Sequence, residues 1–150
     1  MIADADGSTP LHWAACRGAP LDVMQALLHA HPAAASTPNV YGALPLQYAA
    51  YGAPLDVVEL LLRAYPEAAY MASNYGYLPL HCATLYGVHA PLNVVVALLA
   101  VYPEAALVRN NNDDLPDLLS YPAHSIRAAL AAASSARRAP ALLAWARLRL

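Results

Sequence analysis

Apolar residues dominate this chain, but they come in short runs that a proline or a charged residue interrupts every eight to twelve residues. The run VVVALLAVY (94–102) is typical, because it stops at Pro103. In DVVELLL (56–62) the apolar side chains crowd two faces, which is the pattern of a helix packed on both sides. No run reaches the roughly 18 apolar residues that a membrane-spanning helix needs. The pattern therefore predicts short, buried helices.

The prolines mark where these helices begin and end. Proline suits the first turn of a helix and breaks its interior, and the residue before a proline avoids the α region. First helices are therefore predicted at 10–17, 45–51 and 79–86, and second helices at 20–30, 54–64 and 91–101. Each unit is then a helical hairpin followed by a turn.

The spacing of the prolines also shows where the chain forms loops. From the proline that opens a second helix to the one that closes it is always 12 residues, and from there to the next first helix is always 13. Only the interval from the proline that opens a first helix to the proline that opens the second helix of the same unit varies, at 10, 9 and 12 residues. The variation therefore falls at the junction between the two helices. Because a loop tolerates insertions and a packed helix does not, this junction is predicted to be a loop.

Three of these units align as internal repeats. They begin with GSTPLHWAACRG, GALPLQYAAYG and GYLPLHCATLYG, at Gly7, Gly42 and Gly76, which lie 35 and 34 residues apart. A fourth, worn copy begins at Asp113, and its helix is expected at 124–133. One hairpin cannot bury its apolar faces alone, whereas several stacked hairpins share a continuous core. The repeats therefore predict an all-α solenoid.

The first repeat, GSTPLHWAACRG, resembles the opening of an ankyrin repeat, whose signature is G-x-T-P-L-H-x-A-A-x-x-G. The other two openings look like weaker copies, and DVVELLL is similar to the second ankyrin helix. The resemblance implies an ankyrin-type helix-turn-helix solenoid with three full repeats and a degenerate C-terminal capping repeat. We expect a repeat domain at 1–133 and a basic tail or terminal helix at 134–150, with the repeats at about 4–37, 38–72 and 73–109 and the cap at 110–133.

The repeats depart from the ankyrin signature in three respects. Thr9 is replaced by Leu44 and Leu78, so the usual threonine N-cap is lost in two repeats, at about 1 kcal/mol each. Gln47 replaces the repeat histidine. The second helices end in [HY]-P-[AE]-A-A instead of a glycine-rich sequence, and we expect this ending to add half a turn of helix.

His81 and Cys82 are adjacent, which alone would suggest a metal pair or a nucleophile with its base. The repeats favour another interpretation, because His12 and His81 share one position, which in ankyrin repeats is similar to a structural clasp to the backbone of a nearby turn. Gln47 can donate and accept hydrogen bonds there but is not a usual metal ligand. Cys82 takes a position that aromatic residues fill in the other two repeats, so we expect it to be a packing residue.

The tyrosines are the main candidates for recognition, since the chain has ten of them and no phenylalanine. Tyr65 and Tyr102 recur in the Y-P-E-A-A corner and are expected to be structural. The resemblance implies a concave binding face formed by the turns and the first helices, where tyrosine offers a rigid ring and a hydroxyl. The predicted protein-binding residues on this face are Tyr41, Tyr51, Tyr75, Tyr77, Tyr86 and Arg17. The alternative is that tyrosine simply takes the place of phenylalanine.

Composition and charge limit the other classes of function. With 59% hydrophobic and 12% charged residues the chain is too apolar to be disordered. Residues 121–150 hold five arginines and no acid, so the tail could form a basic amphipathic helix that contacts a membrane or nucleic acid. Packing as a cap is the simpler interpretation. Two cysteines 66 residues apart and a start without a signal-peptide pattern lead us to expect an intracellular, cytoplasmic protein.

No enzyme motif such as GxGxxG, GxxxxGK[ST], HExxH or GxSxG occurs in the chain. We therefore expect no catalytic activity, no cofactor, no metal and no small-molecule substrate. The leading hypothesis is a protein–protein interaction module, a scaffold or adaptor that binds its partner as a monomer. The alternative is a structural spacer array from a larger multidomain protein whose catalytic domain lies elsewhere. The chain opens inside the first repeat, so we expect it to be a fragment of a larger protein.

Overall fold

The structure of the chain is a computed structural model that describes residues 3–85 and 90–134. Within these residues it contains seven α-helices and four 3₁₀ helices and no β-strand. In chain order they are α1 (Pro10–Cys16), α2 (Leu21–Ala30), η1 (Pro32–Ser36), α3 (Pro45–Ala50), α4 (Leu55–Ala64), η2 (Pro66–Tyr70), α5 (Pro79–Ala83), α6 (Leu92–Val101), η3 (Pro103–Leu107), η4 (Leu118–Ser120) and α7 (Ala123–Ser134).

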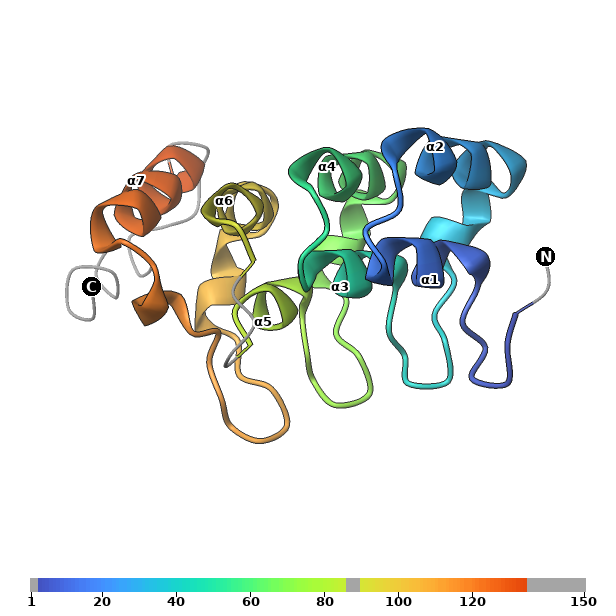
Figure 1. The fold of residues 1–150 in the computed structure, drawn as a ribbon. Helices are drawn as coiled ribbons and strands as arrows, with labels where there is room; N and C mark the ends of the chain where they lie inside the picture. Colours follow the sequence, from blue (N-terminus) through green and yellow to red (C-terminus); the bar gives the residue numbers. More distant parts are fainter. Residues whose placement is uncertain (1–2, 86–89, 135–150) are drawn as a thin grey trace.

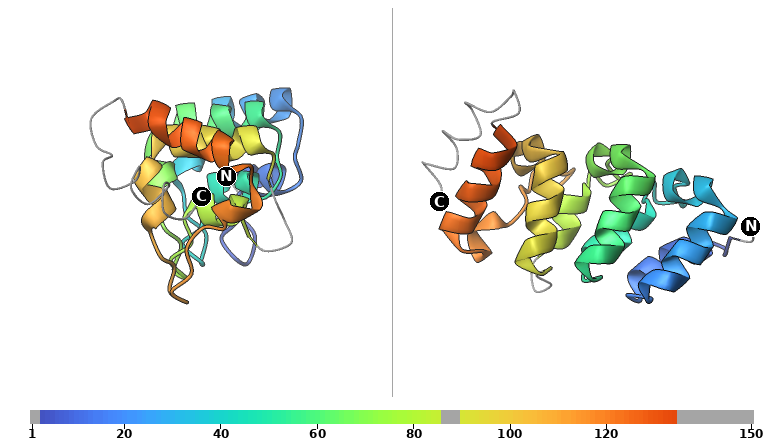
Figure 2. Two further views of the ribbon diagram at one scale, coloured as in Figure 1. Left: turned by 90° about the vertical axis from the view of Figure 1, so that its left-hand side faces the viewer. Right: turned by 90° about the horizontal axis from the view of Figure 1, so that it is seen from above.

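The helices form two rows (Figure 1). The short helices follow one another in the first row, where α1 packs on α3 and α3 packs on α5. The longer helices α2, α4, α6 and α7 lie side by side in the second row, as the view from above in Figure 2 shows. The turns between successive hairpins project from the first row on the side away from the second row. This is the all-helical solenoid that the repeats predict.

Proline begins both kinds of helix, but in two different ways. Pro10, Pro45 and Pro79 occupy the first turn of α1, α3 and α5, as predicted. In the second row the proline is instead the N-cap residue, with ψ between 141° and 153°. This extended backbone keeps the proline ring outside the helix, so each second helix begins one residue later than predicted, at Leu21 in α2 for example.

The helix α5 is shorter than the sequence predicts. The prediction extends it over 79–86, whereas it ends at Ala83. The Thr84 hydroxyl donates to the carbonyl oxygen of Leu80 at 2.9 Å, and the N–H of Ala90 donates to the carbonyl oxygen of Ala83 at 2.9 Å. The carbonyl of Leu80 also accepts the backbone N–H of Thr84, whereas the bond from Ala90 satisfies a carbonyl at the helix end that has no intrahelical partner. Residues 86–89 lie outside the described residues.

Each of the helices α2, α4 and α6 is followed by a turn of 3₁₀ helix. The residue before the proline has a φ between −151° and −137° and a ψ between 80° and 86°, because proline excludes it from the α region. The proline then begins the five-residue helix, whose two central alanines are buried, as Ala68 and Ala69 are in η2. The sequence predicts half a turn of helix here, and the structure has a longer element, a five-residue 3₁₀ helix. Tyr65 and Tyr102 pack against the core as predicted.

One hydrophobic core runs through the stack. The leucine that follows each opening proline, Leu11, Leu46 or Leu80, is 1% exposed. In the fourth unit the single turn η4 stands in place of a first helix, and α7 packs on α6 with Ile126 and Leu130 fully buried. The worn fourth copy therefore covers the C-terminal end of the stack, as expected of a capping repeat.

Among the described helices, none combines the length and the apolar character needed to cross a membrane. The tail from residue 135 onward lies outside the described residues, since α7 ends at Ser134. Its predicted alternatives, a cap or a contact with a membrane or nucleic acid, therefore stay predictions.

Candidate functional site

Backbone hydrogen bonds join the projecting turns to one another. The N–H of Asn74 donates to the carbonyl oxygen of Tyr41 at 2.9 Å, and the N–H of Asn111 donates to that of Tyr75 at 3.1 Å. The side-chain amide of Asn111 also donates to the carbonyl oxygen of Asn74 at 3.0 Å. These bonds hold successive turns at one spacing, and therefore also hold the tyrosines that the turns carry.

Each turn is also closed from within by a side-chain oxygen. Asn39 Oδ1 accepts hydrogen bonds from the N–H groups of Tyr41 and Ala43, both at 3.0 Å. Equivalent bonds in the other turns are accepted by Asp4, Ser73 and Asn110. Gly76 has a φ of +78°, and a Cβ there would lie 2.5 Å from the side-chain oxygen of Asn111. The polar residues of the turns thus stabilise the turn conformation through hydrogen bonds to the backbone.

The third residue of each first helix links its repeat to the next one. His12 Nδ1 accepts a hydrogen bond from the N–H of Thr9 at 3.0 Å, and Nε2 lies 3.0 Å from the carbonyl oxygen of Ala43. Since a carbonyl can only accept, Nε2 carries the proton and Nδ1 is the acceptor. His81 makes the equivalent two bonds, at 3.1 and 3.3 Å. The predicted clasp is confirmed, and it runs between neighbouring repeats.

Gln47 makes the same pair of bonds with an amide in place of a ring. Its Oε1 accepts from the N–H of Leu44 at 2.6 Å, and its Nε2 donates to the carbonyl oxygen of Tyr77 at 2.6 Å. This confirms the prediction that Gln47 can donate and accept the hydrogen bonds of the histidine that it replaces. The N–H of the N-cap residue therefore keeps its hydrogen bond where leucine replaces Thr9, because the third residue of the helix accepts it.

The adjacent His81 and Cys82 do not form a reactive pair. Burial lowers the pKa of His81, so its ring is neutral at physiological pH, and both ring nitrogens face backbone groups. Burial raises the pKa of the Cys82 thiol to about 12, so a thiolate nucleophile does not form near neutral pH. Cys82 is 5% exposed, which confirms its prediction as a packing residue.

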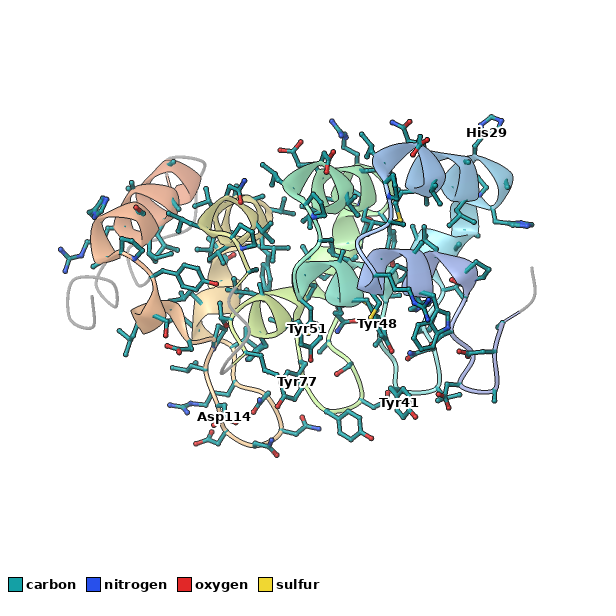
Figure 3. The ribbon with its side chains drawn as sticks, in the orientation of Figure 1. His29, Tyr41, Tyr48, Tyr51, Tyr77 and Asp114 are labelled. Carbon is teal, nitrogen blue, oxygen red and sulfur yellow. The ribbon has the colours of Figure 1, made fainter. Side chains whose placement is uncertain are left out.

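A hollow of about 310 Å³ opens between the second and third units, where the turns meet the first helices (Figure 3). Tyrosines line it from two directions, since some belong to the turns and others to α3 or its C-cap. We call it the tyrosine groove, and its lining consists of Tyr41, Ala43, Gln47, Tyr48, Tyr51, Ser73, Tyr75, Tyr77, Cys82 and Leu85.

The groove follows from a change of residue size along the first helices. Trp13, Tyr48 and Cys82 occupy equivalent positions, and Trp13 is 44% exposed, so a large ring covers this position in the first unit. In the third unit the small cysteine leaves that space open beside Tyr48. Leu85, which follows the C-cap residue of α5, lines the groove with Cys82. The sequence did not predict Tyr48 or Leu85 as binding residues, although Tyr48 lies three residues before Tyr51, a spacing that places two residues on one face of a helix.

Two of the tyrosines are fixed by contacts within the protein. The Tyr48 hydroxyl accepts a hydrogen bond from the side-chain amide of Asn39 at 2.8 Å. The ring of Tyr77 packs edge-on against the ring of His81, with 5.8 Å between the centroids. These two rings therefore form a rigid part of the groove wall.

The other three tyrosines present their rings to solvent. Tyr41, Tyr51 and Tyr75 are 41%, 40% and 58% exposed. The negative charge of Asp6 raises the pKa of Tyr41, and partial burial raises the pKa of Tyr51. Both hydroxyls therefore remain protonated at neutral pH.

Four of the six predicted binding residues line the groove, namely Tyr41, Tyr51, Tyr75 and Tyr77. Tyr86 lies outside the described residues. Arg17 lies in the first unit, where its guanidinium carbon is 5.9 Å from the centroid of the Trp13 ring. The Trp13 ring nitrogen donates to a carboxylate oxygen of Asp4 at 2.8 Å. Arg17 therefore belongs to a separate cluster at the N-terminal end.

The part of the chain that the structure describes holds no group of three or more histidine, cysteine, aspartate or glutamate residues that could bind a metal ion. Its buried side-chain nitrogen and oxygen atoms all have a hydrogen-bond partner. What the groove presents is aromatic surface with hydroxyl groups at its edge, which suits the binding of a side chain or a peptide.

A family model described as ankyrin repeats, three copies, matches residues 1–71. No curated protein matches the chain.

Proposed function

Since residues 1–71 belong to the ankyrin repeat family, we propose that this chain is a scaffold or adaptor that holds a partner protein in the tyrosine groove. Ankyrin repeats are generally protein–protein interaction modules and are generally non-catalytic. In the proposed function the partner binds to the turns and first helices, and no covalent bond is made or broken.

One observation carries this proposal: five tyrosines gather around a single hollow on the side where turns and first helices meet. A tyrosine ring contributes a large rigid contact area at a small cost in conformational entropy. Clustered exposed aromatic residues are typical of interaction surfaces. Replacement of phenylalanine by tyrosine would account for buried rings, but it does not account for the exposed rings of Tyr41, Tyr51 and Tyr75.

A triple variant with Tyr41, Tyr51 and Tyr75 changed to Ala removes the exposed rings of the groove. Tyr77 is kept, because its ring packs on His81 and against the core. We expect the variant to fold, with an unchanged far-UV circular dichroism spectrum. A quantitative pull-down should recover its partners at least about tenfold less well than the wild type, since hot-spot aromatic residues contribute about 2 kcal/mol or more each.

Tyr70→Ala is the matched control for this experiment. Tyr70 is 51% exposed but lies in η2 and does not line the groove, so this variant should recover partners at the wild-type level. If the folded triple variant and the wild type capture the same partners equally, the proposal is wrong. That result would favour the alternative in which the array only spaces or supports a catalytic domain of a larger protein.

A further inference from the structure

A second hollow, of about 390 Å³, adjoins the tyrosine groove on the side of the fourth unit. The two hollows share Tyr77 and Leu85, so they form one continuous surface along the stack. The other residues that line the second hollow are mostly polar. They are His81, Thr84, Asn110, Asp114, Leu115, Pro116 and Asp117. We call it the acidic hollow.

The acidic hollow carries the negative charge of two aspartates that form no salt bridge within the part of the chain that the structure describes. Among the described residues, neither Asp114 nor Asp117 forms a salt bridge, whereas the nearby Asp113 pairs with Arg109 at 3.4 Å. His81 adds no positive charge, because burial lowers its pKa and both ring nitrogens bond to backbone groups. A ligand with a positive charge would therefore meet two carboxylates whose hydrogen-bond partners are the neutral side chains of Ser120 and Asn110.

The protein itself holds these carboxylates in place. The N–H of Asp117 donates to the hydroxyl oxygen of the buried Thr84 at 3.0 Å, and Asp117 Oδ2 accepts a hydrogen bond from the Ser120 hydroxyl at 2.7 Å. The carbonyl oxygen of Asp114 lies 3.3 Å from His81 Nε2. Both backbone positions are thus tied to α5 or its C-cap, so the charges stand at a defined distance from the groove.

We propose that the combined surface binds an extended peptide with an apolar anchor for the tyrosine groove and an arginine or lysine for the acidic hollow. This inference rests on the proposed function and names the chemistry of the partner. The shared Tyr77 ring suits the passage between the two, because a guanidinium group stacks on an aromatic face while it reaches a carboxylate. Side chains two residues apart in an extended chain share one face, about 7 Å apart, so the basic residue should follow or precede the anchor by about two to four positions.

The same charges argue against anionic ligands at this surface. Nucleic acids and anionic lipids would meet Asp114 and Asp117 with like charge, which opposes binding. A peptide with acidic residues beside its anchor would be disfavoured for the same reason. Charge complementarity therefore selects a basic peptide as the occupant.

Selection of a phage-displayed random peptide library on the immobilised full chain tests the inference. We expect the enriched peptides to carry an aromatic residue, leucine or methionine together with a nearby arginine or lysine. Fluorescence anisotropy with the strongest of these peptides then gives its affinity for the wild type and the variants. The arginines of residues 135–150 are present in the wild type and in every variant, so any effect they have on peptide affinity is the same in all of them.

A double variant, Asp114→Asn with Asp117→Asn, removes the two charges and keeps the side-chain shapes. It should bind the selected peptide about fivefold to thirtyfold more weakly, with a smaller dependence on salt concentration. Asp113→Asn is the matched control, because Asp113 is paired with Arg109 and does not line the hollow. We expect it to change the affinity by less than about twofold.

The possible failures separate this inference from the proposed function. Enriched peptides without basic residues, or equal affinity for the double variant and the wild type, would overturn the acidic hollow and leave binding in the tyrosine groove intact. Enrichment of no peptide at all would overturn the peptide inference, while the pull-down still tests the proposed function. Undiminished binding of the selected peptide to the triple tyrosine variant would overturn the proposed function itself.

Discussion

His12, Gln47 and His81 perform one task with two kinds of side chain. Each accepts a hydrogen bond from the N–H of the N-cap residue of its helix and donates one to a carbonyl of the next repeat. An imidazole and a carboxamide both place an acceptor and a donor on one side chain, which is why they can replace each other here. They differ in one respect that matters for stability, because only the histidines titrate.

The two histidine clasps should make stability depend on pH. Burial lowers the pKa of His12 and of His81 in the folded protein, whereas an unfolded histidine titrates near about 6.5. The unfolded state therefore binds more protons below about pH 6.5, and the free energy of unfolding falls as the pH drops from there towards the folded pKa values. Each histidine contributes at most about 1.4 kcal/mol per pH unit within this window.

The double variant His12→Gln with His81→Gln should lose most of this dependence, since Gln47 shows that glutamine can make the clasp. Urea unfolding at pH values on both sides of about 6.5 measures it. The reverse change, Gln47→His, is the matched control and should steepen the dependence. An equal loss of stability on acidification in the wild type and the double variant would show that the clasps do not titrate as described.

At the scale of the elements, the turns are the part of the structure that places the tyrosines. Their spacing depends on backbone bonds between neighbours and on the tight approach of Asn111 to Gly76. Glycine is needed at this position for two reasons, its positive φ and the absence of a Cβ that would meet the asparagine side chain.

Gly76→Ala should therefore lower the free energy of unfolding by about 2 kcal/mol or more, because the left-handed conformation alone costs about 1–2 kcal/mol for alanine. Gly52→Ala is the matched control, since a Cβ at Gly52 meets nothing within 4 Å. Its effect should stay within about 1 kcal/mol. Urea denaturation compares the two variants, and equal destabilisation would contradict the role given to the close approach of the turns.

The helices themselves were largely predictable from the sequence. Prolines act locally, through their fixed φ and missing N–H, so their spacing located six helices and the three 3₁₀ turns that follow the second row. The end of α5 was not predictable, because Ala83 terminates the helix where Thr84 and Ala90 supply bonds from outside it. The bond from Ala90 joins residues seven positions apart, which helical periodicity does not predict.

At the scale of the whole molecule, the groove was predictable only in part. The turn tyrosines are visible in the sequence, but the groove also depends on Cys82 and Tyr48, two residues from different repeats that line it together. The acidic hollow was less predictable from the sequence. Asp114 and Asp117 belong to the degenerate fourth repeat, which aligns poorly with the other three. They meet Tyr77 only once the repeats are stacked.

The central claim is that partners bind in the tyrosine groove, and site-specific photo-cross-linking tests it most directly. A benzophenone amino acid in place of Tyr75 puts the reactive group in the groove, and the same residue in place of Tyr70 puts it at a similarly exposed position outside the groove. We predict that partner proteins cross-link from position 75 and not from position 70. Equal cross-linking from both positions, or cross-linking from position 70 alone, would contradict the account.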